Sequence, residues 1–156
     1  MDKKTILIVD DEPDALECIH EIVTRNGYES ITCSDAASAL KLLASGVHLD
    51  LAIFDLIMPD MNGHDLHSSI KELRPGLPCI IITGYASVES YLTAISSGVF
   101  EYLNKPYRCK DLVAVIAAAL ATSTKMCNGS GRIAVLNADQ GAENKSDNFG
   151  EAMHTW

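Results

Sequence analysis

Residues 5–12 read TILIVDDE, a continuous and largely β-branched apolar run that stops at a group of acidic residues. The pattern recurs along the chain, because the run at residues 51–54 ends in Asp55 and the run at residues 79–82 ends in Thr83. Short apolar runs that are continuous rather than alternating are typical of strands buried on both faces of a parallel sheet. The sequence therefore predicts central strands at these places, each with a polar residue at its carboxyl end.

Helical patterns separate these strands. Apolar residues recur at three- and four-residue spacing over residues 16–23, 36–43, 66–73, 88–95 and 112–120. A more polar segment at residues 29–33 suits an edge strand, and a short strand is expected at residues 100–103. This alternation predicts an α/β fold with a doubly wound parallel sheet, because right-handed crossovers cover the sheet from either side.

Length and composition indicate the domain organisation. At 156 residues, with 47% of them apolar, the chain is the size of one domain that can build its own core. Regular periodicity ends near Ala121, and Gly, Asn and Ser accumulate after that point. We therefore expect a domain over residues 1–122 and a flexible or loosely ordered tail over residues 123–156.

Charge and cysteine usage exclude several classes of protein. A formal net charge of -9 disfavours direct nucleic-acid binding, which needs clustered Lys and Arg. No apolar run approaches the roughly 20 residues of a membrane-spanning helix, so we expect a cytoplasmic protein without a membrane partner. The cysteines are scattered, lack metal-site spacing and agree with a reducing compartment. They are Cys18, Cys33, Cys79, Cys109 and Cys127.

Polar residues gather at the predicted carboxyl edge of the sheet. If the first and third strands are neighbours, Asp10, Asp11 and Asp55 converge there, and their carboxylates repel one another unless a cation lies among them. Oxygen ligands of this kind fit Mg2+ better than zinc. Each residue alone has an ordinary explanation, since acids stabilise helix N-termini and Asp residues form turns. Their occurrence together with Thr83 and Lys105 at one edge favours a functional site.

Four motifs carry a resemblance to a known family. They read ILIVDDEP at residues 6–13, DLIMPDMNG at 55–63, ITG at 82–84 and YLNKP at 102–106. In their order and spacing they resemble the receiver domain of bacterial response regulators, and the resemblance spans about residues 4–121. It implies a flavodoxin-like (βα)5 fold, a parallel five-stranded sheet with strand order 2-1-3-4-5.

The resemblance also implies a role for each polar residue at this edge. Asp55 corresponds to the phosphoacceptor. Its carboxylate would hold Mg2+ together with Asp10, Asp11 and the backbone carbonyl of Ile57. The positions that bind the phosphoryl group and switch conformation correspond to Thr83, Tyr102 and Lys105, and Pro106 corresponds to a position where a cis peptide bond is usual.

As a receiver, the chain would accept a phosphoryl group from a sensor histidine kinase or a phosphotransfer protein, which its first helix (residues 14–25) would recognise. Phosphorylation would switch the surface of the fourth helix, fifth strand and fifth helix (residues 87–121). That surface would bind a downstream protein, a fused output domain or a second copy of the chain. The only catalysis expected is self-phosphorylation and slow dephosphorylation. In this family the positions of Ile57 and Tyr85 flank the water that attacks the phosphoryl group. Dephosphorylation is expected to be slow because neither side chain can orient that water well.

Three alternatives stay open at this point. A haloacid-dehalogenase-type phosphatase would need a second Asp where Ile57 stands. A flavodoxin would place its flavin phosphate against Asp10, Asp11 and Glu12, which would repel it. A pseudo-receiver that signals through partner binding alone is disfavoured by the acidic pair and by Lys105.

Overall fold

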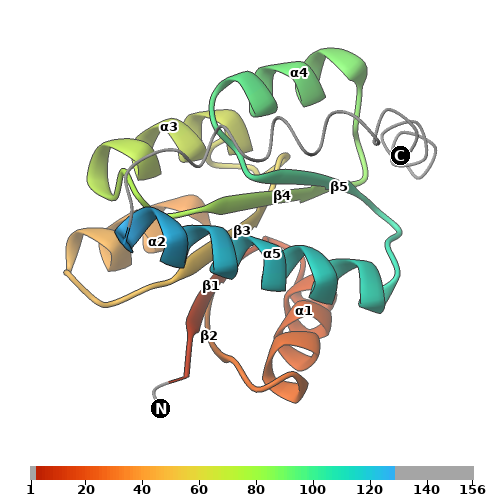
Figure 1. Ribbon diagram of the computed structural model, residues 1–156. Coiled ribbons are helices and arrows are strands. Elements are labelled where there is room, and N and C mark those ends of the chain that lie inside the picture. Colours follow the sequence, from red (N-terminus) through yellow and green to blue (C-terminus); the bar gives the residue numbers. More distant parts are fainter. Residues whose placement is uncertain (1–2, 129–156) are drawn as a thin grey trace, which may run out of the picture. The chain divides into compact units, whose positions relative to one another are not determined.

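The computed structural model of the protein describes residues 3–128, in which strands and helices alternate strictly (Figure 1). The strands are β1 (Thr5–Val9), β2 (Glu29–Cys33), β3 (Leu51–Asp55), β4 (Cys79–Thr83) and β5 (Glu101–Asn104). The helices are α1 (Pro13–Arg25), α2 (Ala36–Ala44), α3 (Gly63–Leu73), α4 (Val88–Ser96) and α5 (Cys109–Asn128). The predicted α/β fold with a strand and a helix in each unit is confirmed.

All strands pair in parallel in one five-stranded sheet of order β2-β1-β3-β4-β5. This is the order that the family resemblance implied. Because β1 and β3 are neighbours, with Val9 opposite Phe54, the residues that follow them lie side by side at the carboxyl edge. The polar edge segment that was expected at residues 29–33 is the edge strand β2.

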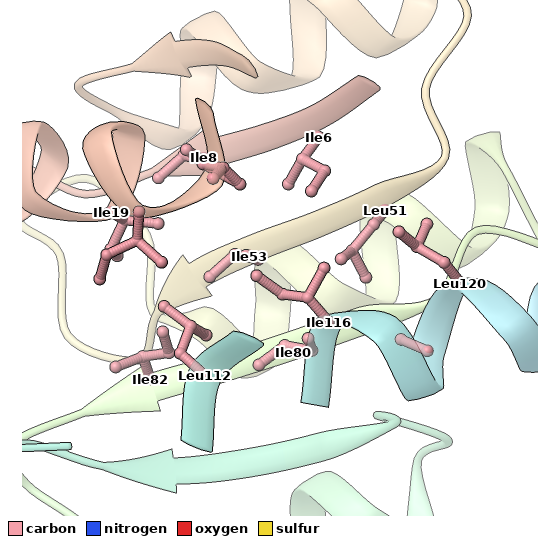
Figure 2. Packing of buried hydrophobic residues seen from close by; sticks show 13 residues of the cluster. Ile6, Ile8, Ile19, Leu51, Ile53, Ile80, Ile82, Leu112, Ile116 and Leu120 are labelled. Carbon is pink, nitrogen blue, oxygen red and sulfur yellow. The ribbon is translucent and has the colours of Figure 1, made fainter. Parts of the chain in front are cut away.

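One face of the sheet is covered by α1 and α5 and buries an aliphatic cluster (Figure 2). The labelled members are Ile6, Ile8, Ile19, Leu51, Ile53, Ile80, Ile82, Leu112, Ile116 and Leu120. Alternate residues along β1, β3 and β4 contribute to it, as the two-residue period of a strand requires. Burial of each large aliphatic side chain contributes about 1.5–3 kcal/mol, so this face is the main source of apolar stabilisation.

The other face lies under α2, α3 and α4 (Figure 1). It takes the intervening residues of the strands, including Leu7, Phe54 and Tyr102, each at most 1% exposed. The helix α4 contributes little to this core, because Ala94 is its buried residue. Apolar burial therefore holds α4 less strongly than it holds α1 or α5.

Side-chain caps set the first residues of the helices that flank the carboxyl edge. Asn62 accepts a hydrogen bond from the backbone N–H of Asp65 at the start of α3 (2.9 Å). Ser87 does the same for Ser90 at the start of α4 (3.0 Å). Each cap satisfies an N–H group that has no partner within its helix. The helices α3 and α4 therefore begin at defined positions beside the loops that follow β3 and β4.

The helix α5 continues to Asn128, past the boundary that was predicted at residue 122. Residues up to Leu120 form one compact unit. The rest of the predicted tail, residues 129–156, lies outside the described residues. Within the described part of the chain, no helix is long and apolar enough to cross a membrane.

Candidate functional site

Two buried carboxylates meet at the carboxyl edge of the sheet. Asp10 directly follows β1 and Asp55 ends the neighbouring strand β3, and their exposed fractions are 2% and 9%. The backbone N–H of Asp10 donates to the carbonyl of Cys33, which prolongs the pairing of β1 with β2 by one residue (3.2 Å). The strand register therefore places these acids side by side, as expected from the sequence.

A single ammonium group joins the two carboxylates. Lys105 Nζ lies 3.2 Å from Asp10 Oδ2 and 3.0 Å from Asp55 Oδ2. Lys105 follows β5, and its backbone N–H donates to the carbonyl of Thr83 at the end of β4 (2.8 Å). The Lys105–Pro106 peptide bond is cis. Residues more than 40 positions apart are thus held around one charged centre.

The second oxygen of each carboxylate is held by the backbone. Asp10 Oδ1 accepts a hydrogen bond from the N–H of Glu12 (3.0 Å), and Asp55 Oδ1 accepts one from the N–H of Ile57 (3.1 Å). Each acid therefore has one oxygen tied to the chain two residues on and one oxygen that faces Lys105. This arrangement fixes the orientation of both carboxylates before any ligand binds.

Burial and charge shift the pKa values of Asp10 and Lys105. Desolvation raises the pKa of Asp10, and the charge of Asp55 raises it further. The backbone N–H of Glu12 and the Lys105 ammonium act in the opposite direction, because they favour the ionised form, but they do not outweigh desolvation. Desolvation alone would lower the pKa of Lys105, but its contacts with Asp55 and Asp10 outweigh burial and raise it. The two carboxylates therefore favour the charged form of Lys105, while burial disfavours the ionised form of Asp10.

The donor set fits a hard divalent cation in part. Asp10 and Asp55 present carboxylate oxygens toward one positive charge, which is the donor chemistry that Mg2+ prefers. Asp11 is exposed. Among the residues that the structure describes, no three Asp, Glu, His or Cys side chains lie close enough to hold a metal ion together. The predicted role of Asp11 as a ligand therefore stays a prediction.

The predicted switch residues lie next to this centre. Thr83 is buried at the end of β4, and its Oγ1 accepts a hydrogen bond from the N–H of Tyr85 (3.0 Å). The Tyr85 side chain is 73% exposed. Tyr102 is fully buried, with its ring edge-to-face against Tyr91 at a centroid distance of 5.6 Å. Thr83 and Tyr102 thus lie on adjacent strands, β4 and β5.

Gly63 allows the start of α3 to pack directly on the phosphoacceptor candidate. A Cβ atom at Gly63 would lie 2.8 Å from the carbonyl oxygen of Asp55 and 2.8 Å from Cα of Leu56. These are backbone atoms that cannot move aside cheaply. The N–H of Gly63 also donates to the carbonyl of Leu56 (2.6 Å). A side chain at this position would displace the loop that carries Asp55.

Sequence reasoning missed the role of Asp60 in this loop. Its carboxylate accepts hydrogen bonds from the backbone N–H groups of Ala36 (3.4 Å) and Ala37 (3.1 Å) at the start of α2. The loop after Asp55 is thereby tied to a helix that precedes it by more than 20 residues. The motif around residue 60 predicted a turn, and no local signal pointed to this distant helix end.

The chain is similar in sequence to known signalling proteins. The family described as response regulator receiver domain matches residues 6–117. The DNA-binding transcriptional regulator NtrC of Azospirillum brasilense is 36% identical over 124 residues, which are 80% of this chain and 26% of that protein. The transcriptional regulatory protein GlrR of Escherichia coli (strain K12) is 34% identical over 131 residues, 84% of this chain and 29% of that protein.

Solved structures agree. A CheY-like response regulator receiver domain protein from Methanospirillum hungatei JF-1 superposes with a TM-score of 0.76 at 34% identity, covering 80% of this chain and 99% of that one. The response regulator TrrA from Thermotoga maritima, solved in complex with Mg(2+)-BeF, gives a TM-score of 0.68 at 32% identity, covering 75% of this chain and 99% of that one. The chain spans about a quarter of the length of NtrC and GlrR. Its fold and the match over residues 6–117 show that the chain belongs to the response regulator receiver domains of two-component signalling systems.

Proposed function

We propose that Asp55 accepts a phosphoryl group from a sensor histidine kinase or a phosphotransfer protein, with Mg2+ as the cofactor. The observation that carries this proposal is the position of Lys105, whose ammonium group contacts the carboxylates of both Asp10 and Asp55. An arrangement that already neutralises carboxylate charge with one lysine is suited to receive a dianionic phosphoryl group at the same place.

The chemistry requires little beyond positioning. A carboxylate oxygen of Asp55 attacks phosphorus, the bond from phosphorus to the donor nitrogen breaks, and a mixed anhydride forms on Asp55. Negative charge on the phosphoryl oxygens is then met by the Lys105 ammonium and by the Thr83 hydroxyl. The backbone N–H of Ile57 keeps Asp55 oriented, because it already holds Oδ1 at 3.1 Å.

The metal would be held by the carboxylates of Asp10, Asp11 and Asp55 and by the backbone carbonyl of Ile57. When bound, Mg2+ supplies charge neutralisation of the transferring phosphoryl oxygens without a proton transfer. Asp10 and Asp55 support this assignment, since both direct a carboxylate oxygen toward the ammonium group of Lys105.

The response would pass to the surface formed by α4, β5 and α5, over residues 87–121. Two large apolar side chains of α4, four residues apart, are strongly exposed on it, Val88 at 75% and Leu92 at 58%, and Tyr85 in the preceding loop is 73% exposed. Exposed apolar side chains at helical spacing are suited to a protein partner. Candidate occupants are a downstream protein, an output domain fused to the receiver, or a second copy of the chain, in the cytoplasm.

The phosphorylated form is expected to be long-lived. The residues that flank the attacking water are Ile57 and Tyr85, and both side chains point largely into solvent, at 49% and 73% exposure. Neither offers a carboxylate or an amide to orient water. The chain therefore acts as a signalling phosphoacceptor whose own dephosphorylation is slow.

The proposal is tested by exposure to acetyl phosphate with and without Mg2+, with intact mass as the readout. We expect wild type to gain the mass of one phosphoryl group only with Mg2+, and Asp55→Asn to gain none. Asp14→Asn is the matched control, because Asp14 is an exposed acid at the start of α1. Equal labelling of wild type and Asp55→Asn would overturn the proposal.

A further inference from the structure

A bridge of hydroxyl and imidazole groups links the three elements α3, α4 and β5. The hydroxyl of Tyr102 on β5 donates to Oγ of Ser90 on α4 (2.7 Å), and Nε2 of His64 on α3 lies 3.2 Å from the same oxygen. We refer to Tyr102, Ser90 and His64 together as the Ser90 bridge. None of its contacts follows from local sequence, because its members are 12 and 26 residues apart.

The geometry points to Ser90 and His64 as positioning residues that hold the Tyr102 ring in its buried rotamer and so couple it to the loop that carries Asp55. This inference rests on the function proposed for Asp55 and Tyr102. It adds a connection from the phosphoacceptor to α4 that runs through α3 and is separate from Thr83.

The burial of Tyr102 gives the bridge its importance. Its side chain is fully buried, so its hydroxyl is removed from water and an unfulfilled hydrogen bond there would cost about 1–3 kcal/mol. Ser90 supplies an acceptor at 2.7 Å, which is a normal length for a bond between hydroxyl groups. The buried rotamer of Tyr102 is therefore favoured while Ser90 stays in place.

The position of Ser90 is in turn fixed at both ends. Its backbone N–H donates to the Ser87 side chain, which caps α4. Its hydroxyl meets His64, and either tautomer completes that bond, because Nε2 can accept the Ser90 proton or donate its own to Oγ. Ala94 is the buried residue of α4, and this polar link joins the start of α4 to α3, as the bond from Lys71 Nζ to the carbonyl of Ser97 does at its other end (2.9 Å).

At its other end, the Ser90 bridge lies next to the loop that carries Asp55. His64 directly follows Gly63, which packs against the backbone of Asp55 and Leu56 at distances that exclude a side chain. A shift of the loop that carries Asp55 is therefore transmitted to His64 by one peptide unit, and from there to Ser90 and Tyr102. Conversely, loss of the bridge removes one of the contacts that hold the start of α3, next to the loop that must be ordered when a phosphoryl group binds.

The experiment uses the full chain labelled with 3-fluorotyrosine, with the Tyr102 resonance assigned from Tyr102→Phe. We expect Ser90→Ala to shift or broaden this resonance in the absence of any ligand and Ser90→Thr, which keeps the hydroxyl, to restore it. Binding of beryllofluoride with Mg2+ is then expected to weaken about 2- to 10-fold in Ser90→Ala, the scale of one lost neutral hydrogen bond. His64→Leu should act in the same direction, and His64→Gln should act less.

The control is Ser96→Ala, because the Ser96 hydroxyl bonds to the carbonyl of Leu92 within the same helix. It should leave both the resonance and the affinity unchanged. In a Tyr102→Phe background, Ser90→Ala should lose most of its effect on beryllofluoride binding, since both changes remove the same bond.

A wild-type Tyr102 resonance in Ser90→Ala, or an undiminished effect of Ser90→Ala in the Tyr102→Phe background, would overturn the inference. Measurements on the wild-type protein show whether the function proposed for Asp55 fails separately from the inference about Ser90. If the wild-type protein neither binds beryllofluoride nor takes a phosphoryl group, the assignment of Asp55 fails and the coupling falls with it. The ligand-free spectra then still decide whether Ser90 positions Tyr102.

Discussion

The face of the sheet under α1 and α5 buries an aliphatic cluster, whereas the face under α2, α3 and α4 buries polar groups among its apolar side chains. His67 on α3 is 3% exposed, and Tyr102 carries its hydroxyl into the interior. Apolar contacts are insensitive to small changes of direction, while hydrogen bonds are directional and can be exchanged. The first face is therefore suited to be a scaffold, and the second is suited to rearrange when Asp55 changes charge.

The largest expected effect is on the scaffold face. Ile116→Ala on α5 removes a fully buried side chain of the aliphatic cluster and should lower the free energy of unfolding by about 2–5 kcal/mol, because a cavity remains after the lost burial. Urea unfolding, extrapolated linearly to water, measures it. A loss below about 1 kcal/mol would show that α5 is not the anchor that its burial indicates.

The buried His67 on the second face makes the stability of the folded protein depend on pH. Burial lowers the pKa of His67 from its ordinary value of 6.5, and the charges of Lys71 and His64 add to this. The unfolded chain then takes up a proton more readily than the folded chain. The stability associated with neutral His67 is therefore complete above pH 6.5 and is lost as the pH falls from 6.5 toward the lowered value.

His67→Gln should flatten this dependence, whose slope for one proton is at most about 1.4 kcal/mol per pH unit. Urea unfolding between pH 5 and pH 8 provides the measurement. His48→Gln is the control, because the His48 side chain is 79% exposed. If the free energy of unfolding varied with pH equally in wild type and in His67→Gln, then burial of His67 would not make the second face sensitive to pH.

At the carboxyl edge, function and stability are expected to oppose each other. Desolvation raises the pKa of Asp10, so its ionised form is less favourable in the folded protein than in the unfolded chain. In the presence of a metal chelator, Asp10→Asn should therefore raise the free energy of unfolding at pH 7, by about 1 kcal/mol, the scale of one polar contact. The gain should disappear below the ordinary pKa of 3.8, where the acid is protonated in both states.

Urea unfolding at pH 7 and pH 3.5 tests this expectation, with Asp11→Asn as the neighbouring exposed control. A loss of stability in Asp10→Asn at pH 7 would mean that its contact with Lys105 outweighs the cost of burying its charge. In that case Asp10 would belong with the stabilising scaffold rather than with the groups held in place for function.

The smallest effect is expected on the outer surface of α4. Leu92→Ala removes a side chain that is 58% exposed and should change the free energy of unfolding by less than about 0.5 kcal/mol. The change is measured by the same urea unfolding experiment as for Ile116→Ala. The two variants together compare one truncation on α4 with one on α5. A loss near that of Ile116→Ala would show that α4 is anchored by apolar contacts after all.

Much of the fold could be predicted from the sequence because its cause is local. The apolar runs before Asp10, Asp55 and Thr83 are continuous, a pattern that is typical of strands covered on both faces. The family resemblance supplied the strand order, which the structure confirms. The convergence of Asp10 and Asp55 then followed from the adjacency of β1 and β3.

The strands, the helices and the polar residues at their ends could be predicted from the chain alone, since they depend on periodicity and on residue chemistry. Tertiary packing determines which of those residues share an interaction: the contact of Lys105 with two carboxylates, the Asp60 cap on α2 and the Ser90 bridge. The physical reason is that these contacts join residues 12 to 95 positions apart. Their distances depend on how layers pack, and no local pattern of the chain encodes them.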